Sequence, residues 1–128
     1  MQLTPDNFDI EAEKVVKSLD RNKNNKLILT TSQIRKLLSM SADIYDDVKN
    51  SPDEDLSADI KSRIKYFKVR CTYEFGRDES YGPVRDFISK AELLNQIDEA
   101  AKSKQKYITF SRYMEALVAY FKFYGGKD

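Results

Sequence analysis

The chain of 128 residues contains no histidine, no tryptophan and a single cysteine. Without histidine, Ser-His-Asp and Cys-His nucleophilic sites, HExxH zinc sites and histidine acid/base catalysis are excluded. A single cysteine also excludes a disulfide framework within the chain and any thiolate-rich metal site. We therefore expect this chain to hold no metal ion and no cofactor.

The single cysteine, Cys71, lies among apolar residues at helical spacing. This position is typical of a small buried side chain and not of a reactive thiol. No stretch reaches the roughly 18 apolar residues that a bilayer span needs, and residues 1–9 have neither a basic flank nor an apolar secretion core. The sequence therefore predicts a cytoplasmic protein without a membrane partner.

Glycine and proline are also scarce, with four and three residues. Long stretches without either residue favour helices over strands, and the length is that of one domain. We therefore predict an all-α fold in which residues 1–128 form a compact single-domain bundle of about five helices. The expected helices follow Thr4, Thr30, Ser51, Pro83 and Thr109 and end near residues 19, 48, 77, 101 and 124.

The last of these helices differs from the others because it is apolar around nearly its whole circumference. Its apolar residues are Tyr113, Met114, Leu117, Val118, Tyr120, Phe121, Phe123 and Tyr124. Such a helix is either the central element of a bundle or partly a docking surface for another chain. The pattern favours the central position.

A calcium loop is the first candidate site, because Asp20, Asn22 and Asn24 occupy positions one, three and five of an EF-hand-like pattern. The twelfth position, which needs a bidentate glutamate, is Thr31, and three basic residues surround the segment. A second segment around residues 101–112 lacks the ligands as well, with Arg112 in place of the glutamate. A polar loop between helices is the better interpretation of both segments.

Charge is divided unevenly along the chain, although the formal net charge is only +1. Residues 43–59 carry seven acids and one base, whereas residues 61–77 carry six bases and one acid. In the basic segment Arg63, Arg70 and Arg77 are seven residues apart, so successive side chains on a helix are turned by only about 20°. Tyr66 and Tyr73 fall between them, which predicts one ridge of arginines and tyrosines beside the apolar stripe of that helix.

The arginine and tyrosine ridge has two interpretations. Arginine binds phosphate oxygens with two hydrogen bonds and tyrosine can stack or donate a hydrogen bond, so the ridge suits a nucleic-acid backbone. Alternatively, it is a solvated flank whose arginines pair with the acidic segment 43–59. Paired carboxylates such as Asp46 and Asp47 lack the apolar surroundings of a catalytic acid, and no glycine-rich phosphate loop is present. We therefore expect a protein that is not an enzyme.

Three segments carry a resemblance to a known family. They are RYMEALVAYFKFYGGKD at residues 112–128, LTTSQIRKLLS at residues 29–39 and RIKYFKVRCTYEFGR at residues 63–77. Together they resemble the small subunit of the type III-A CRISPR effector, the Csm complex, over most of the chain. The resemblance implies a small helical subunit without catalytic activity.

The resemblance also implies partners. In that family several copies stack beside the crRNA-bound backbone subunits, which cut the paired target RNA, and the large polymerase-like subunit responds to the target. The expected partners are therefore crRNA and target RNA, the backbone RNase subunit, the large subunit and further copies of this chain. Acidic residues 43–59 of one copy are a candidate contact for basic residues of the next copy.

The resemblance further implies which basic side chains contact the RNA backbone, independently of its base sequence. The matching positions are Arg35, Arg63, Lys68, Arg77, Arg112 and Lys122, and Arg70 is added by the ridge geometry. Arg63 and Arg77 are supported by both arguments. The alternative function is a purely structural spacer that makes no RNA contact.

Overall fold

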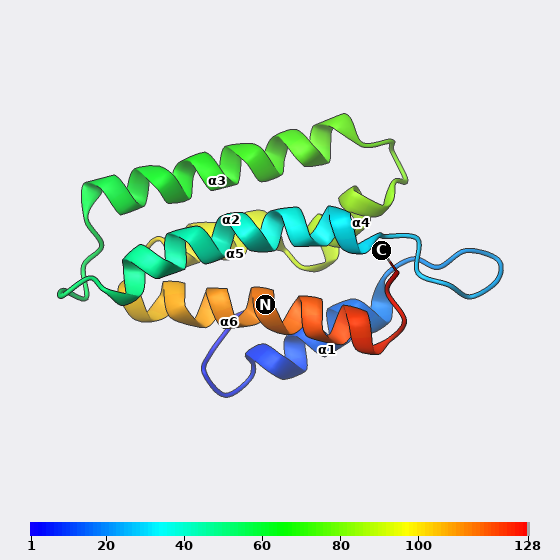
Figure 1. Ribbon diagram of the computed structural model, residues 1–128, viewed down its shortest axis with the longest axis horizontal. Helices are drawn as coiled ribbons and strands as arrows, with labels where there is room; N and C mark the ends of the chain where they lie inside the picture. Colours follow the sequence, from blue (N-terminus) through cyan, green and yellow to red (C-terminus); the bar gives the residue numbers. More distant parts are fainter. Residues whose placement is uncertain (128) are drawn as a thin grey trace.

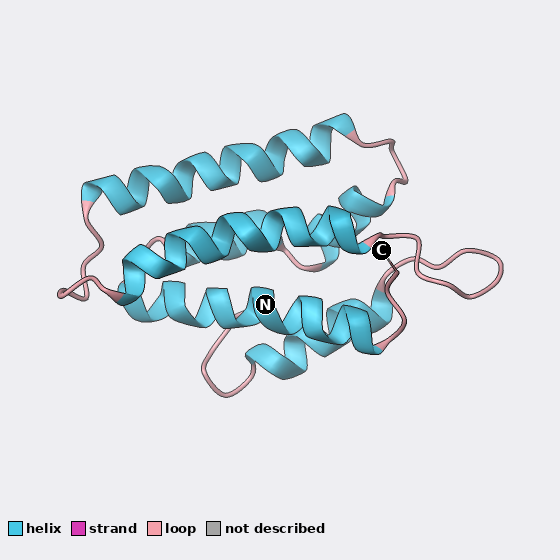
Figure 2. Ribbon diagram, viewed as in Figure 1, coloured by secondary structure: helices cyan, strands magenta, loops and turns pink. Residues whose placement is uncertain are grey.

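The apolar helix α6 (Lys104–Phe123) lies at the centre of the fold, packed against α1, α2 and α5. The structure is a computed structural model that describes residues 1–127, and the helices in this range account for the whole regular structure (Figure 2). The remaining helices are α1 (Phe8–Ser18), α2 (Thr31–Lys49), α3 (Ala58–Arg77), α4 (Pro83–Lys90) and α5 (Leu93–Ala100). The predicted all-α fold is confirmed, with one more helix than expected.

The three long helices α3, α2 and α6 lie side by side in one layer (Figure 1). The shorter helices α4 and α5 pack behind this layer, and α1 packs along α6. One hydrophobic cluster includes residues from all six helices. Because α2 runs antiparallel to α3, the start of α2 lies beside the end of α3, and this pairing positions the charged side chains described below.

Helix α6 supplies the largest share of the buried aromatic side chains, which confirms its predicted central position. Its buried residues include Tyr107, Phe110, Tyr113, Met114, Leu117 and Phe121. The Tyr107 hydroxyl donates a hydrogen bond to the Ser41 carbonyl at 2.7 Å, and the Tyr113 hydroxyl donates one to the Ala91 carbonyl at 3.0 Å. Each tyrosine therefore buries its ring in the core and satisfies its hydroxyl on a neighbouring element.

The start of α6 differs from the sequence prediction by one turn and a half. The helix begins at Lys104, where the Ser103 hydroxyl accepts a hydrogen bond from the Lys106 amide, and not after Thr109. Glu54 accepts two more amide hydrogen bonds of this first turn, from Lys104 through its carbonyl and from Gln105 through its carboxylate. Local spacing did not reveal this cap because the acceptor comes from a distant loop.

The same glutamate explains why the predicted start of α3 at Ser51 is wrong. Instead of closing a capping box with Ser51, Glu54 contacts α6, and residues 50–57 form an irregular connection. Leu56 is buried in the core, and α3 begins only after Ser57, whose hydroxyl accepts the Ile60 amide at 3.1 Å. The capping box of Thr30 and Gln33 at the start of α2, by contrast, is confirmed.

The predicted fourth helix is divided into α4 and α5. The division falls at Glu92, which has a left-handed backbone with φ of 53°. Ala91 before it is fully buried, and its carbonyl is the acceptor of the Tyr113 hydroxyl. This change of direction allows Phe87 on α4 and Leu93 on α5 to enter the same core.

Candidate nucleic-acid interface

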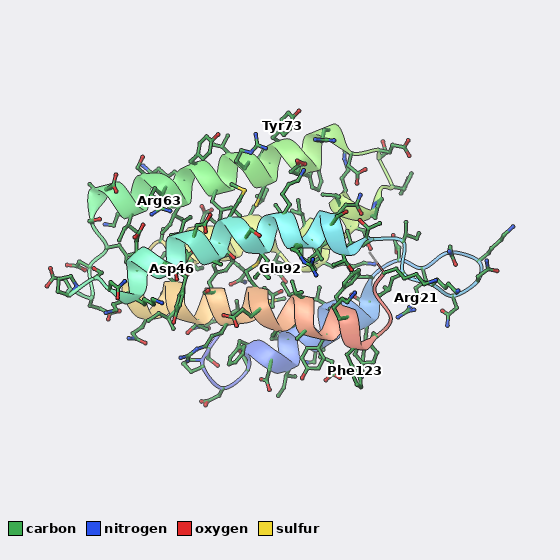
Figure 3. The ribbon with its side chains drawn as sticks, viewed as in Figure 1. Arg21, Asp46, Arg63, Tyr73, Glu92 and Phe123 are labelled. Atoms are coloured by element: carbon green, nitrogen blue, oxygen red, sulfur yellow. The ribbon has the colours of Figure 1, made fainter. Side chains whose placement is uncertain are left out.

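The three arginines of the predicted ridge lie on one flank of α3, but they have different surroundings. Arg63 lies between α3 and α2 (Figure 3), where its guanidinium donates a hydrogen bond to the carboxylate of Asp47. This is the pairing with the acidic segment that the second interpretation of the ridge predicts. At this arginine the charge is therefore balanced within the chain.

Arg70 and Arg77 lie over the exposed ring of Tyr73. Their guanidinium carbons are 5.4 and 5.9 Å from the ring centroid, within the range of cation–π attraction. Tyr73 lies at the edge of the molecule on the side of α3 away from α2 (Figure 3). The second half of the ridge therefore combines two cations and an aromatic ring at the surface.

A buried carboxylate joins α3 to the start of α2 at this end of the ridge. Glu74 is 8% exposed, and its Oε1 atom lies 3.5 Å from both Lys36 Nζ on α2 and Arg77 Nη1 on α3. The oxygen makes no hydrogen bond within residues 1–127. Because two cations share this one carboxylate, it does not neutralise both of them.

Lys36 is the residue of this cluster that sequence reasoning missed. The sequence shows Arg35 and Lys36 near the start of α2, but the face that they occupy depends on how α2 packs against α3. The contact with Glu74 places Lys36 beside Arg77. We define the basic end as the positively charged residues Arg35, Lys36, Arg70 and Arg77, at the start of α2 and the end of α3.

Arg35 and Arg112 are exposed side chains on α2 and α6. Within residues 1–127 neither guanidinium makes an ion pair or a side-chain hydrogen bond. Lys122 also lies on α6, but its ammonium donates hydrogen bonds to the Thr31 hydroxyl at 3.4 Å and to the Gly126 carbonyl at 3.3 Å. Lys122 therefore joins the end of α6 to the start of α2.

Lys68 lies apart from the ridge, although it is on the same helix. Its ammonium lies 2.9 Å from both carboxylate oxygens of Asp98 on α5, which packs behind the layer of long helices. The fold therefore brings Lys36, Arg70 and Arg77 together and directs Lys68 to a different side of α3.

Cys71 is buried, as its sequence position predicts. Burial, with a smaller contribution from Glu74, raises the pKa of its thiol to about 12. The thiol is therefore protonated at neutral pH and is a poor nucleophile there.

The candidate calcium loop satisfies its own polar groups. The Asn22 side-chain oxygen accepts the amides of Asn24 and Lys26, and the carboxylate of Asp20 pairs with Lys90 at 3.1 Å. Residues 1–127 contain no group of three or more His, Cys, Asp or Glu side chains placed to hold a metal ion. In the same range no helix combines the length and the apolar character that a membrane crossing requires.

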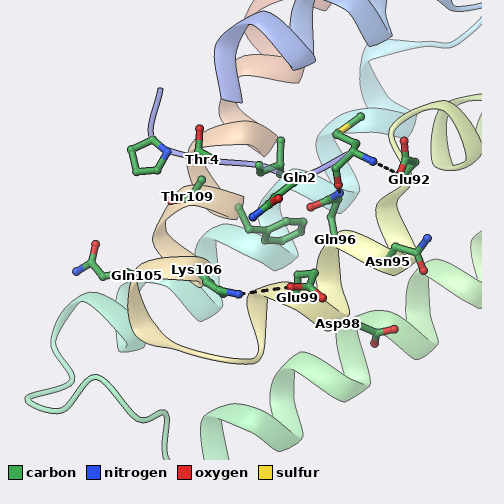
Figure 4. A pocket seen from close by; sticks show the side chains of 14 residues that line it. Gln2, Thr4, Glu92, Asn95, Gln96, Asp98, Glu99, Gln105, Lys106 and Thr109 are labelled. Carbon is green, nitrogen blue, oxygen red and sulfur yellow. Dashed lines mark hydrogen bonds and ion pairs between the residues drawn. The ribbon is translucent and has the colours of Figure 1, made fainter. Parts of the chain in front are cut away.

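A pocket of about 710 Å³ lies between residues 1–5, α5 and the start of α6 (Figure 4). The acidic residues that line it all form ion pairs. Glu92 binds the terminal amine of Met1 at 3.1 Å, and Glu99 binds Lys102 at 2.7 Å and Lys106 at 3.5 Å. The hydrogen bond from Lys102 lowers the pKa of Glu99. These ion pairs connect chain segments, and the basic end is the stronger candidate for a binding site.

Comparison with known proteins gives matches over almost the entire chain. Residues 2–127 match the family described as Csm2 type III-A. A Streptococcus thermophilus protein named "CRISPR system Cms protein Csm2" is 42% identical over 126 residues, which are 98% of each chain. Proteins of the same name from Mycobacterium tuberculosis and Enterococcus italicus are 35% and 38% identical, covering 100% and 88% of this chain and 99% and 86% of theirs. The similarity therefore extends over all six helices.

Proposed function

The chain belongs to the Csm2 family, the small subunit of the type III-A CRISPR effector called the Csm complex, and from this premise we propose that its basic side chains hold RNA in that complex. The proposed ligand is the duplex of crRNA and target RNA. Base pairing reads the sequence of the target, so the subunit needs to contact only the backbone. In this proposal the chain works in the cytoplasm and contributes no catalytic group.

The observation that carries this proposal is the basic end. Lys36 and Arg77 share the single carboxylate of Glu74, and Arg35 makes no ion pair within the described residues. Phosphates attract such unbalanced cations, and arginine can bind two phosphate oxygens at once. Arg112 is a further exposed arginine, on α6. We propose Arg35, Arg70, Arg77 and Arg112 as the principal backbone contacts, with Lys36 added by the structure.

The remaining proposed contacts are Arg63, Lys68 and Lys122. In the isolated chain Arg63 pairs with Asp47 and Lys68 pairs with Asp98. To bind a phosphate, each of these side chains exchanges an acidic partner for the RNA. Their net contribution to affinity is therefore smaller than that of the basic end, because the lost ion pair offsets part of the gain.

The test is target-RNA binding by the reconstituted complex over a series of salt concentrations. A variant with Arg35→Ala and Arg77→Ala is compared with a control that carries Lys14→Ala and Lys102→Ala, which removes the same charge from other exposed sites. We expect the first variant to bind RNA about fivefold more weakly for each lost contact, with a salt slope lower by about one for each. The control should bind like the wild type.

The second candidate function is a structural spacer that makes no RNA contact. It is favoured by the ion pairs of Arg63 and Lys68, which show that the fold itself uses part of the basic surface. Native mass spectrometry first establishes that both variants assemble. If the variant with Arg35→Ala and Arg77→Ala then assembles normally and binds RNA with unchanged affinity and salt slope, the spacer function is correct and the RNA contact is wrong.

A further inference from the structure

The outer face of α3 carries a row of exposed residues with the spacing of a coiled-coil seam. Ser62, Tyr66, Val69, Tyr73 and Gly76 follow one another at steps of four, three, four and three. The apolar members are well exposed, at 61% for Tyr66, 60% for Val69 and 54% for Tyr73. Apolar residues at this spacing form the surface with which one helix packs along another. We call these five residues the outer seam.

The outer seam is separate from the face with which α3 joins the bundle. That inner face consists of Ile60, Ile64, Phe67 and Cys71, all of which are buried. In Figure 3, Tyr73 points away from the neighbouring helices. Helix α3 therefore has apolar residues in two rows, and only the inner row is covered within the described chain.

The charges beside the outer seam indicate what kind of helix fits it. Arg63, Arg70 and Arg77 each follow a seam residue directly, and Lys65 precedes Tyr66. In a coiled coil these flanking positions determine the choice of partner through charge. On one side Asp47 balances Arg63 and Arg77 shares Glu74 with Lys36, while Arg70 lies over Tyr73; on the other side lies Lys65. A second α3 would place like charges against each other, so self-pairing of this face is unfavourable.

Two further observations favour a protein over RNA at this surface. Val69 lies at the centre of the seam, and an aliphatic side chain offers a phosphate or sugar no hydrogen bond. Beside the seam, a groove of about 410 Å³ between α2 and α3 is lined partly by Met40, Ile44, Tyr66 and Phe67. Such a groove accepts an apolar side chain of a packed helix.

We propose that the outer seam binds an amphipathic helix of a different protein subunit, with acidic residues beside the apolar stripe of that helix. The seam supplies the apolar contact, and Lys65, on the flank opposite Arg70 and Arg77, selects an acidic residue beside that stripe. This proposal does not depend on RNA contacts of the basic end. It requires only that the chain is assembled with its partner subunits.

The first experiment places a photoreactive amino acid at position 69 of the chain in the reconstituted Csm complex. The expected result is a crosslink to another protein subunit, within a helix that has acidic residues around an apolar stripe, identified by mass spectrometry. The control places the same group at position 10, where Ile10 is 52% exposed on α1. Crosslinks to RNA or to another copy of this chain overturn the proposal, as does the absence of any crosslink specific to position 69.

The second experiment measures selectivity with synthetic helical peptides of four heptads. One peptide carries leucine in the seam and glutamate in the flanking positions, and its control carries lysine there instead. We expect the acidic peptide to bind the intact chain at least about tenfold more tightly at low salt, and Val69→Ser to weaken this binding about tenfold. Ile10→Ser should leave the binding unchanged. Equal binding of both peptides, or no effect of Val69→Ser, contradicts the proposal.

The two experiments remain separate from the test of RNA binding. Val69→Ser changes no charge and lies outside the basic end, so the affinity for target RNA should remain within about twofold of the wild type in a complex that still assembles. A loss of RNA affinity with intact assembly would instead assign the seam to RNA. Loss of RNA binding in the Arg35→Ala and Arg77→Ala variant, by contrast, says nothing about the seam crosslink at position 69.

Discussion

Arginines of the same heptad row lie at both ends of the α2–α3 pair, but the two ends differ in how many acidic side chains lie near the arginine. At one end Arg63 meets Asp47, and further acids of α2 lie nearby in sequence. At the other end Arg77 shares Glu74 of its own helix with Lys36, and the facing start of α2 carries no acid. The comparison teaches that the number of opposite charges brought by the neighbouring helix, and not the arginine spacing, decides where positive charge is left for a ligand.

The largest effect on stability is expected from a substitution that weakens the packing of α3, the helix that contains both Arg63 and Arg77. Phe67 is fully buried on the inner face of α3, with its ring centroid 6.2 Å from that of Phe110 on α6. Phe67→Ala should lower the free energy of unfolding by about 3 to 5 kcal/mol through lost burial and a residual cavity. Urea denaturation measures this loss. Tyr66→Ala, one residue away and exposed, is the matched control and should cost less than about 1 kcal/mol.

Charge reversal at the acid-rich end of α2 tests whether its carboxylates contact the next copy of the chain in the complex. Asp43 and Asp46 are exposed on α2, and neither pairs with Arg63. If these carboxylates face basic residues of the next copy, Asp43→Lys plus Asp46→Lys should weaken each contact by about 1 kcal/mol. Native mass spectrometry should then show fewer small subunits in each assembled complex. An unchanged stoichiometry would exclude this contact.

The pH dependence of the free energy of unfolding tests the burial of Cys71 on the inner face of α3. Burial raises the pKa of Cys71 to about 12, whereas an unfolded thiol ionises near its ordinary value of 9.0. The unfolded state therefore loses a proton first, and stability falls as the pH rises between about 9 and 12, by up to about 1.4 kcal/mol per pH unit. Burial also raises the pKa of Tyr107 and Tyr113, which adds to the loss at higher pH.

Chemical denaturation at pH 8 and pH 10 measures this dependence, with Cys71→Ala as the comparison. The variant should lose less stability between the two pH values than the wild type does, because its side chain does not titrate. The absolute stability of Cys71→Ala at pH 8 is a separate quantity that reflects packing. If both proteins lose the same stability between pH 8 and pH 10, the thiol does not contribute to the alkaline effect.

The sequence predicts those features that depend on neighbours along the chain. The helical periodicity, the Thr30 and Gln33 capping box and the inner face of α3 are all confirmed. The predicted starts of α3 and α6 are wrong for a common reason, since Glu54 caps α6 across more than 50 residues of sequence. Likewise, the arginine row and the i,i+3 pairing of Arg77 with Glu74 follow from spacing, but the contacts of Arg63 with Asp47 and of Lys36 with Glu74 follow from the packing of α2 on α3.

The smallest expected effect is the difference in RNA binding between single arginine substitutions at the two ends. In the assembled complex, Arg77→Ala removes a cation from the basic end, whereas Arg63→Ala removes one that Asp47 already balances. Arg77→Ala should weaken target-RNA binding about fivefold and lower the salt slope by about one. Arg63→Ala should weaken binding less than about twofold, because Arg63 gives up its ion pair with Asp47 to bind a phosphate and so adds little net affinity in the wild type. Filter binding at several salt concentrations separates the two variants. If they weaken binding equally, the neighbouring acids do not decide which arginines reach the RNA, and the heptad row acts as a single surface.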